Sequence, residues 1–109
     1  LSTPSFELLL NIVYNTKQKP VGQVRFDVKG GLAEINMLVS SKYRGKGYGM
    51  KMITQGSRMF LKDKKNVKFI LARIKVENLA SISAFEKAGY AQKIIRGGIV
   101  SVKFPSRQS

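Results

Sequence analysis

Cysteine and histidine are both absent from this chain of 109 residues. Without cysteine there can be no disulfide bridge, no thiolate nucleophile and no cysteine-based metal site, and we expect no bound metal. Without histidine, a reaction that needs a general base must rely on a carboxylate or on water. No apolar run approaches the ~20 residues that span a bilayer, and no signal peptide is visible. We therefore expect a cytoplasmic protein with no membrane partner.

Acidic residues are scarce beside basic ones. Lysine and arginine number 20 against 6 aspartates and glutamates, which gives a formal net charge of +14. This excess favours an anionic partner, although a basic surface can also serve solubility alone. Nucleic acid is the weakest of the anionic candidates, because the sequence shows no array of aromatic residues for stacking on bases.

Apolar periodicity predicts a single α+β domain over residues 1–109, with the order β-β-β-α-β-α-β-β. The predicted strands are Phe6–Asn15, Val21–Val28, Leu32–Val39, Val67–Lys75, Ala91–Ile95 and Ile99–Phe104. The predicted helices are Gly47–Lys62 and Leu79–Ala88. The first three strands form an antiparallel meander, in which Gly30-Gly31 is a hairpin turn.

Side-chain spacing predicts which faces of these elements are buried. In the strand over residues 21–28, alternation places Val21, Gln23, Arg25 and Asp27 on one face and Gly22, Val24, Phe26 and Val28 on the other. The long helix has an apolar inner face and a basic outer stripe; the inner face is Met52, Ile53, Gly56 and Phe60, and the stripe is Lys51, Gln55, Arg58 and Lys62. On the second helix, the residues predicted to face inward are Leu79, Ile82 and Phe85.

A glycine-rich turn, Arg44-Gly45-Lys46-Gly47-Tyr48-Gly49, joins the third predicted strand to the long predicted helix. Glycines let the backbone turn tightly, and the first N–H groups of the following helix have no intrahelical partner. The positive end of the helix dipole, with Arg44 and Lys46 beside it, makes this turn suitable for a phosphate or diphosphate. A turn without any ligand can have the same composition, so a second motif is needed to decide.

The second motif runs from Asn78 to Tyr90, with Asn78 as the predicted N-cap of a short helix and Gly89 as its C′ residue. Together the two motifs make the chain similar to the GNAT superfamily of N-acetyltransferases. In that family an Arg/Gln-x-x-Gly-x-Gly/Ala loop binds the diphosphate of acetyl-CoA, and the residues that match it are Arg44, Gly47 and Gly49. The residues that match the family's later signature are Asn78, Ser81, Phe85, Lys87, Gly89 and Tyr90. The resemblance covers residues 21–90, and it implies a GNAT-like fold with a central mixed sheet and two helices.

The resemblance implies acetyl-CoA as co-substrate, bound where two parallel neighbouring strands, here Leu32–Val39 and Val67–Lys75, splay apart. The residues whose backbone would hold the pantetheine arm and the acetyl carbonyl are Met37, Leu38 and Val39. The residues of the diphosphate turn would be Arg44, Gly45, Lys46, Gly47, Tyr48 and Gly49. From the second helix, the implied cofactor-binding residues are Asn78, Ser81 and Phe85. Asn78 would bond the pantetheine, cap its helix, or do both.

Direct attack by a primary amine in a ternary complex needs a base, and Glu34 is the candidate among the six acids. It lies on the strand before the glycine turn, where several family members carry an acid. The alternative is an exposed strand residue paired with Arg25 or another cation. The family's usual proton donor is a tyrosine, and Phe85 replaces it here. Either water protonates the CoA thiolate, or the thiolate leaves unprotonated.

The family's usual opening, a strand and one or two helices, is missing, and the chain begins at Leu1. We therefore expect a fragment or the C-terminal domain of a longer protein, which binds the cofactor but acetylates poorly alone. The chain looks most like a subgroup associated with bacterial surface-sugar biosynthesis, which implies an amino sugar or nucleotide sugar as acceptor. The alternatives are a protein or peptide N-acetyltransferase and a non-catalytic acyl-CoA-binding domain. The sequence leaves a homodimer open.

Overall fold

The computed structural model describes residues 12–14 and 19–105, and its elements follow the predicted order. The strands are β1 (Ile12–Tyr14), β2 (Pro20–Lys29), β3 (Leu32–Val39), β4 (Phe69–Lys75), β5 (Ala91–Arg96) and β6 (Ile99–Phe104). The helices are a short 3-10 helix η1 (Ser41–Tyr43) and the α-helices α2 (Tyr48–Asp63) and α3 (Leu79–Lys87). These bounds agree closely with the predicted ones. Of the first predicted strand, residues 6–11 and 15 lie outside the described residues.

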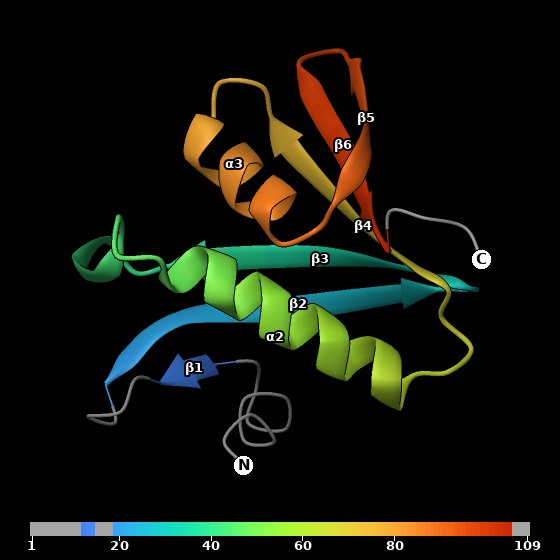
Figure 1. Cartoon of the computed structure of the whole chain (residues 1–109), viewed down its shortest axis with the longest axis horizontal. Coiled ribbons are helices and arrows are strands. Elements are labelled where there is room, and N and C mark those ends of the chain that lie inside the picture. Colours follow the sequence, from blue (N-terminus) through green and yellow to red (C-terminus); the bar gives the residue numbers. More distant parts are fainter. Residues whose placement is uncertain (1–11, 15–18, 106–109) are drawn as a thin grey trace.

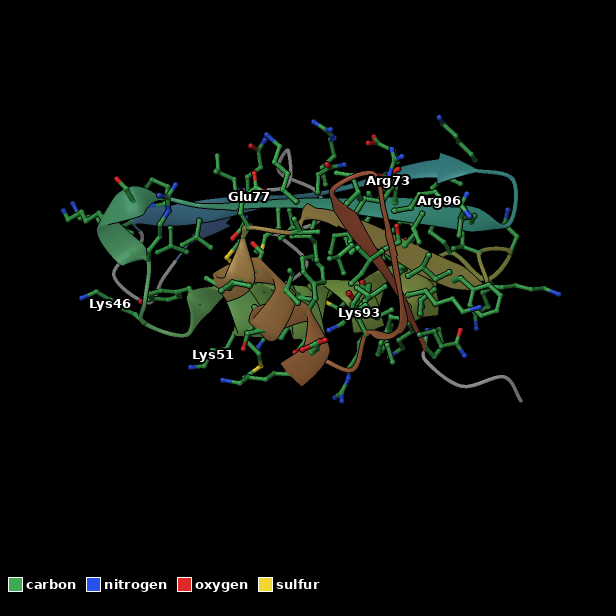
Figure 2. All side chains as sticks on the ribbon, turned by 90° about the horizontal axis from the view of Figure 1, so that it is seen from above. Lys46, Lys51, Arg73, Glu77, Lys93 and Arg96 are labelled. Atoms are coloured by element: carbon green, nitrogen blue, oxygen red, sulfur yellow. The ribbon has the colours of Figure 1, made fainter. Side chains whose placement is uncertain are left out.

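The strands form one six-stranded sheet in the order β1-β2-β3-β4-β6-β5. The β3–β4 pair is parallel and the other neighbouring pairs are antiparallel. Helices α2 and α3 lie on the same side of the sheet (Figure 1), and within the described part of the chain no helix covers the other side (Figure 2). The predicted mixed α+β fold is confirmed. None of the helices in residues 19–105 has the length and apolar character needed to cross a membrane.

The core lies between the sheet and the two helices, and the inner face of α2 is the one predicted. Its buried residues include Met52, Ile53, Gly56 and Phe60, while Lys51, Gln55, Arg58 and Lys62 are exposed. The Phe60 ring stacks on Phe26 of β2 with their centroids 4.3 Å apart. Burying one such side chain contributes about 1.5–3 kcal/mol. This packing fixes α2, and with it the glycine turn, against β2 and β3.

The predicted alternation of β2 is wrong at its start. Val21 and Val24 are both buried, whereas the strict alternation placed them on opposite faces. The reason is a bulge on the β1 side: Val13 pairs with Gly22 and Tyr14 with Pro20, so Val21 has no partner in β1. At Gly22 the backbone of β3 comes so close that a Cβ would overlap with the Leu38 carbonyl oxygen.

The predicted inner face of α3 is wrong at Leu79, whose residue surface is 72% exposed. Phe85 is buried and Ile82 packs against the core, so the buried face begins only after the first turn. That first turn contributes to a cavity instead of the core, as described below. The predicted end of the helix is confirmed: Gly89 has φ of 102°, and the Tyr90 N–H donates to the Phe85 carbonyl oxygen at 3.0 Å.

Candidate functional site

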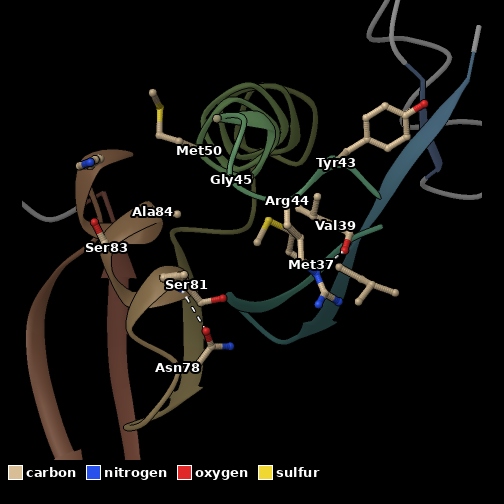
Figure 3. Close-up of a pocket in the computed structure, with 15 residues that line it drawn as sticks. Met37, Val39, Tyr43, Arg44, Gly45, Met50, Asn78, Ser81, Ser83 and Ala84 are labelled. Atoms are coloured by element: carbon tan, nitrogen blue, oxygen red, sulfur yellow. Dashed lines mark hydrogen bonds between the residues drawn. The ribbon is translucent and has the colours of Figure 1, made fainter. Parts of the chain in front are cut away.

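The candidate site is a gap between β3 and β4. The two strands pair at Leu32–Phe69, Ala33–Ile70 and Glu34–Leu71. Beyond Glu34, β3 continues to Val39 in pairing with β2, and it separates from β4. A cavity of about 680 Å³ opens at the end of β3, bounded by the glycine turn, the start of α2 and helix α3 (Figure 3).

Most of the residues predicted to contact acetyl-CoA line this cavity. They are Met37, Leu38, Val39, Arg44, Gly45, Gly47, Gly49, Asn78 and Ser81. The predicted residues outside the lining are Lys46, Tyr48 and Phe85. Sequence reasoning missed several lining residues, namely Tyr43, Met50, Ala80, Ser83, Ala84 and Lys87. Four of the missed residues follow the i, i+3, i+4, i+7 spacing of one helix face, which was the available signal.

The glycine turn presents bare backbone to the cavity. Gly45 and Gly47 have φ of 75° and 84°, values that favour glycine. A Cβ at either position would meet no other described atom within 4 Å. Gly47 is the N-cap of α2 and accepts the first helical hydrogen bond, from the Lys51 N–H. The N–H groups before Lys51 therefore have no intrahelical partner, and such a helix start suits an anion.

Arg44 brings positive charge to the cavity and is tied to the end of β3. Its Nε–H donates to the Val39 carbonyl oxygen at 3.1 Å (Figure 3). The terminal amino groups of the guanidinium have no partner in the described part of the chain. Gly49 packs the start of α2 on the same strand end, since a Cβ there would lie 3.7 Å from Met37 Cε. The turn, the helix start and the strand end therefore form one wall.

Asn78 caps its helix, and its role in binding a cofactor stays a prediction. It is the N-cap of α3, and its Oδ1 accepts the Ser81 N–H at 3.2 Å (Figure 3). Asn78 also lines the cavity, and the cap uses its oxygen alone. The NH₂ group remains available as a donor to a ligand. Capping fixes the side chain in place, so the donor is held on the α3 wall.

The position of the family's tyrosine offers no hydroxyl here. Phe85 is 4% exposed and packs edge-on against Tyr90, with their centroids 5.0 Å apart. The Tyr90 hydroxyl is buried 2.7 Å from Ser57 Oγ. Burial raises the pKa of Tyr90 well above its ordinary value, opposed in part by the Ser57 hydrogen bond. Tyr43 is the phenol that lines the cavity, and its ring packs edge-on against Tyr48.

Glu34 lies at the point where β3 and β4 part, but outside the cavity lining. It points to the side of the sheet away from the helices, because its neighbours Ala33 and Ile35 are buried under them. Its Oε2 accepts the Arg73 Nε–H at 3.0 Å, and Arg73 lies on that same side (Figure 2). The sequence alternative of an ion pair thus holds, with Arg73 in place of Arg25. The role of Glu34 as base stays a prediction.

Among the described residues, no group of three or more His, Cys, Asp or Glu side chains could hold a metal ion.

Residues 3–90 match the model of the Acetyltransferase (GNAT) family. The chain belongs to this family. GNAT enzymes use acetyl-CoA as their co-substrate, as the sequence resemblance implied.

Solved structures show the same fold for this GNAT domain. Mutant forms of the spermidine/spermine N-acetyltransferase SpeG from Vibrio cholerae match with a TM-score of 0.71 and 17% identity, over 85% of this chain and 63% of that one. The spermidine N-acetyltransferase in complex with CoA and spermine matches with a TM-score of 0.71 and 17% identity, over 85% and 62%. The dodecameric structure in its intermediate state matches with a TM-score of 0.70 and 16% identity, over 85% and 61%.

The chain thus spans less than two thirds of the length of these structures. Identities of 16–17% support a shared fold alone. No curated protein sequence matches the chain significantly. The finer prediction of a surface-sugar subgroup is not confirmed by these comparisons.

Proposed function

We propose that this chain is one acetyltransferase domain, which transfers the acetyl group of acetyl-CoA to a primary amine. The observation that carries the proposal is the separation of β3 from β4 after Glu34, directly before the glycine turn. It opens a cavity lined by apolar side chains, by glycine backbone and by two cations, Arg44 and Lys87. In the reaction the amine nitrogen bonds to the acetyl carbon, the carbon–sulfur bond breaks, and CoA leaves as the thiol or thiolate.

The residues that line the cavity support acetyl-CoA as its ligand. The end of β3, from Met37 to Val39, would hold the pantetheine arm, with the Asn78 NH₂ group opposite it on α3. The glycine turn and Arg44 would hold the diphosphate, because the turn offers open backbone and the guanidinium offers unpaired donors. When bound, acetyl-CoA supplies an activated acyl group, and these residues supply its position.

Glu34 remains our proposed base, and its placement suggests how the amine would arrive. The cofactor would occupy the helix side of the gap, so the amine must approach from the opposite side. Leu38 lies on the same face of β3 as Glu34 and is among the residues that line the cavity, which supports an approach from that side. Arg73 holds the carboxylate of Glu34 in one place beside the opening. Glu34 would then accept a proton from the amine, directly or through a water molecule.

For the acceptor we propose an anionic amine, such as an amino sugar linked to a nucleotide. The side of the sheet without a helix carries more cations than acids. Its cations include Arg25, Arg73, Lys75 and Lys103, exposed or half-buried, and its acids are Asp27 and Glu34, which pair with Arg25 and Arg73. The cavity itself is lined by Arg44 and Lys87 and, in the described residues, by no carboxylate. A polyamine such as spermidine, the substrate named for the similar structures, would meet repulsion from these charges.

The test is acetyl transfer by the 109-residue chain to a panel of amines. The panel comprises an amino-sugar nucleotide, spermidine and a peptide with a free N-terminus, with thiol release and the mass of the product as readouts. We expect acetylation of the amino-sugar nucleotide above the other two. Faster acetylation of spermidine would overturn the acceptor. Binding of acetyl-CoA with no transfer to any amine would contradict catalysis by this chain alone. That result would fit either a non-catalytic CoA-binding domain or a domain whose acceptor site needs further elements.

A further inference from the structure

The end of the sheet opposite the glycine turn carries a dense group of lysines. The β2–β3 turn and the segment that joins α2 to β4 both lie at this end, away from η1 (Figure 1). The Lys68 N–H donates to the Gly31 carbonyl oxygen at 2.8 Å, which ties the two segments together. We call this region the basic end, and its lysines, all of them exposed, are Lys29, Lys62, Lys64, Lys65 and Lys68.

Little negative charge offsets these lysines. The acids carried by the neighbouring elements β2, β3 and α2 are Asp27, Glu34 and Asp63, and each already pairs with a cation. Only the pair of Asp63 with Lys64, at 3.8 Å, involves a lysine of the basic end. In the described part of the chain the other four ammonium groups take part in no hydrogen bond or ion pair. An anionic surface would therefore be attracted to this end.

Apolar side chains are exposed within the same region. Val28 is 47% exposed and Leu32 is 40% exposed, one on each side of the glycine turn of the hairpin. They lie on opposite faces of the hairpin, because Val28 pairs with Ala33 and Leu32 with Lys29. Binding to a lipid surface grows with the apolar area that enters the headgroup region and with the attraction of lysines to anionic lipids. The basic end offers both.

The aromatic rings near the basic end are not free to stack on nucleic acid bases. Phe26 and Phe60 stack on each other with their centroids 4.3 Å apart. Lys103 Nζ lies over the Phe69 ring, 4.4 Å from its centroid. Single-stranded nucleic acids are bound by exposed rings along a basic groove, and the lysines here lack the planar fork of arginine. The observations therefore favour lipid headgroups over nucleic acid.

We propose that the basic end docks this domain reversibly on a membrane surface of anionic phospholipids, with Val28 and Leu32 in the headgroup region and the lysines against the lipid phosphates. The sequence predicts no membrane partner because it lacks a spanning run, and a surface contact requires none. The cavity lies at the glycine-turn end of the sheet (Figure 1), so docking leaves it open to its ligand. The inference is thus independent of the proposed function.

The experiment is co-sedimentation of the chain with vesicles of phosphatidylcholine alone and of phosphatidylcholine mixed with phosphatidylglycerol. We expect binding to the mixed vesicles, weakened by salt, and little binding to phosphatidylcholine alone. A triple variant removes lysines of the basic end: Lys62→Gln, Lys65→Gln and Lys68→Gln. It should lower the partition onto mixed vesicles about tenfold or more, since each lysine near such a surface contributes about 1 kcal/mol.

The matched control removes the same charge at the glycine-turn end, outside the cavity lining. Its substitutions are Lys42→Gln, Lys51→Gln and Lys75→Gln. All six lysines are exposed, so both triple variants should keep the Tm of the unaltered chain, and the control should keep most of the vesicle binding. Leu32→Ser, which changes no charge, should weaken vesicle binding as well.

Three results would overturn the inference. Equal losses in the two triple variants would show that only the overall net charge attracts lipid. Equal binding to the two kinds of vesicle, or none to either, would exclude an anionic membrane as the partner. A single-stranded oligonucleotide whose binding is lost in the Lys62/Lys65/Lys68 variant, while vesicle binding stays unchanged, would assign the basic end to nucleic acid. Unchanged vesicle binding in Leu32→Ser would contradict the place given to the apolar side chains.

Discussion

Replacing Glu34 by glutamine separates the two roles that the structure leaves for this residue. The substitution removes the charge and the basicity of the side chain but keeps an oxygen that can accept the Arg73 Nε–H. In the unaltered chain this hydrogen bond, from Arg73 Nε to Glu34 Oε2, is 3.0 Å long. If Glu34 is the base, kcat should fall about 10²-fold or more, which corresponds to about 2.7 kcal/mol of lost transition-state stabilisation. The KM for acetyl-CoA should stay unchanged, because Glu34 does not line the cavity.

The structural cost of the same change should be small. The side chains of Arg73 and Glu34 are 59% and 32% exposed, so solvent screens their pairing. Exposed pairs of this kind contribute about 0.2–1 kcal/mol to the free energy of unfolding. For a domain of this size, 1 kcal/mol shifts Tm by about 4–8 °C at most. A large loss of turnover at nearly constant Tm would therefore be a chemical effect.

The matched control for this variant is Asp27→Asn. Asp27 lies directly opposite Glu34 on β2 and is also paired with an arginine, since Arg25 Nε lies 3.3 Å from Asp27 Oδ2. Asp27→Asn removes the same charge from the same face of the sheet, one strand further from the gap between β3 and β4. The assay is thiol release in the presence of the best acceptor, with Tm measured alongside. Full turnover in Glu34→Gln, or equal losses in both variants, would refute the role of Glu34 as base.

Further predictions concern the turn, the sheet and the core. Gly47→Ala should weaken CoA binding roughly tenfold or more, about 1.4 kcal/mol, because its Cβ would enter the space proposed for the diphosphate; Gly97→Ala, also at positive φ with open space around it, should bind CoA normally. Gly22→Ala should lower the free energy of unfolding by about 1–3 kcal/mol, since its Cβ would also lie 2.9 Å from Met52 Cε; an unchanged urea midpoint would contradict the close approach. The pKa of Tyr90 is raised on folding, so its share of stability is full below the unfolded value of about 10 and is lost as pH rises above it. Tyr90→Phe should therefore flatten the fall of Tm at alkaline pH, and an equally steep fall would speak against the buried hydroxyl.

Local sequence signals were enough to predict most of the fold and the centre of the candidate site. Glycine spacing identified the turn, and Asn78 and Gly89 marked the two ends of α3, because capping and positive φ depend on neighbouring residues alone. Apolar periodicity identified the inner face of α2 for the same reason. These features need no knowledge of what packs against them.

The features that could not be predicted depend on partners far away in the sequence. Val21 is buried because of a bulge set by the register of β1 against β2. Leu79 is exposed although its spacing matches that of the buried residues, because the buried face of α3 begins only after the first turn. The ion pair of Glu34 with Arg73 joins residues 39 positions apart, and the register of the parallel strands decides it. The registers of β1 against β2 and of β3 against β4 cannot be derived from a single sequence.

The most direct test of the central claim follows the backbone amides of the chain during a titration with acetyl-CoA, by ¹H–¹⁵N NMR spectra. The account predicts saturable shifts of the amides at Gly45, Gly47 and Gly49 and of the Asn78 side-chain NH₂ group. The chemical shift of the Gly97 amide, in the β5–β6 turn, should stay unchanged. Saturable shifts confined to the β5–β6 hairpin, or no shift at all at the glycine turn, would contradict the assignment of the β3–β4 gap as the acetyl-CoA site.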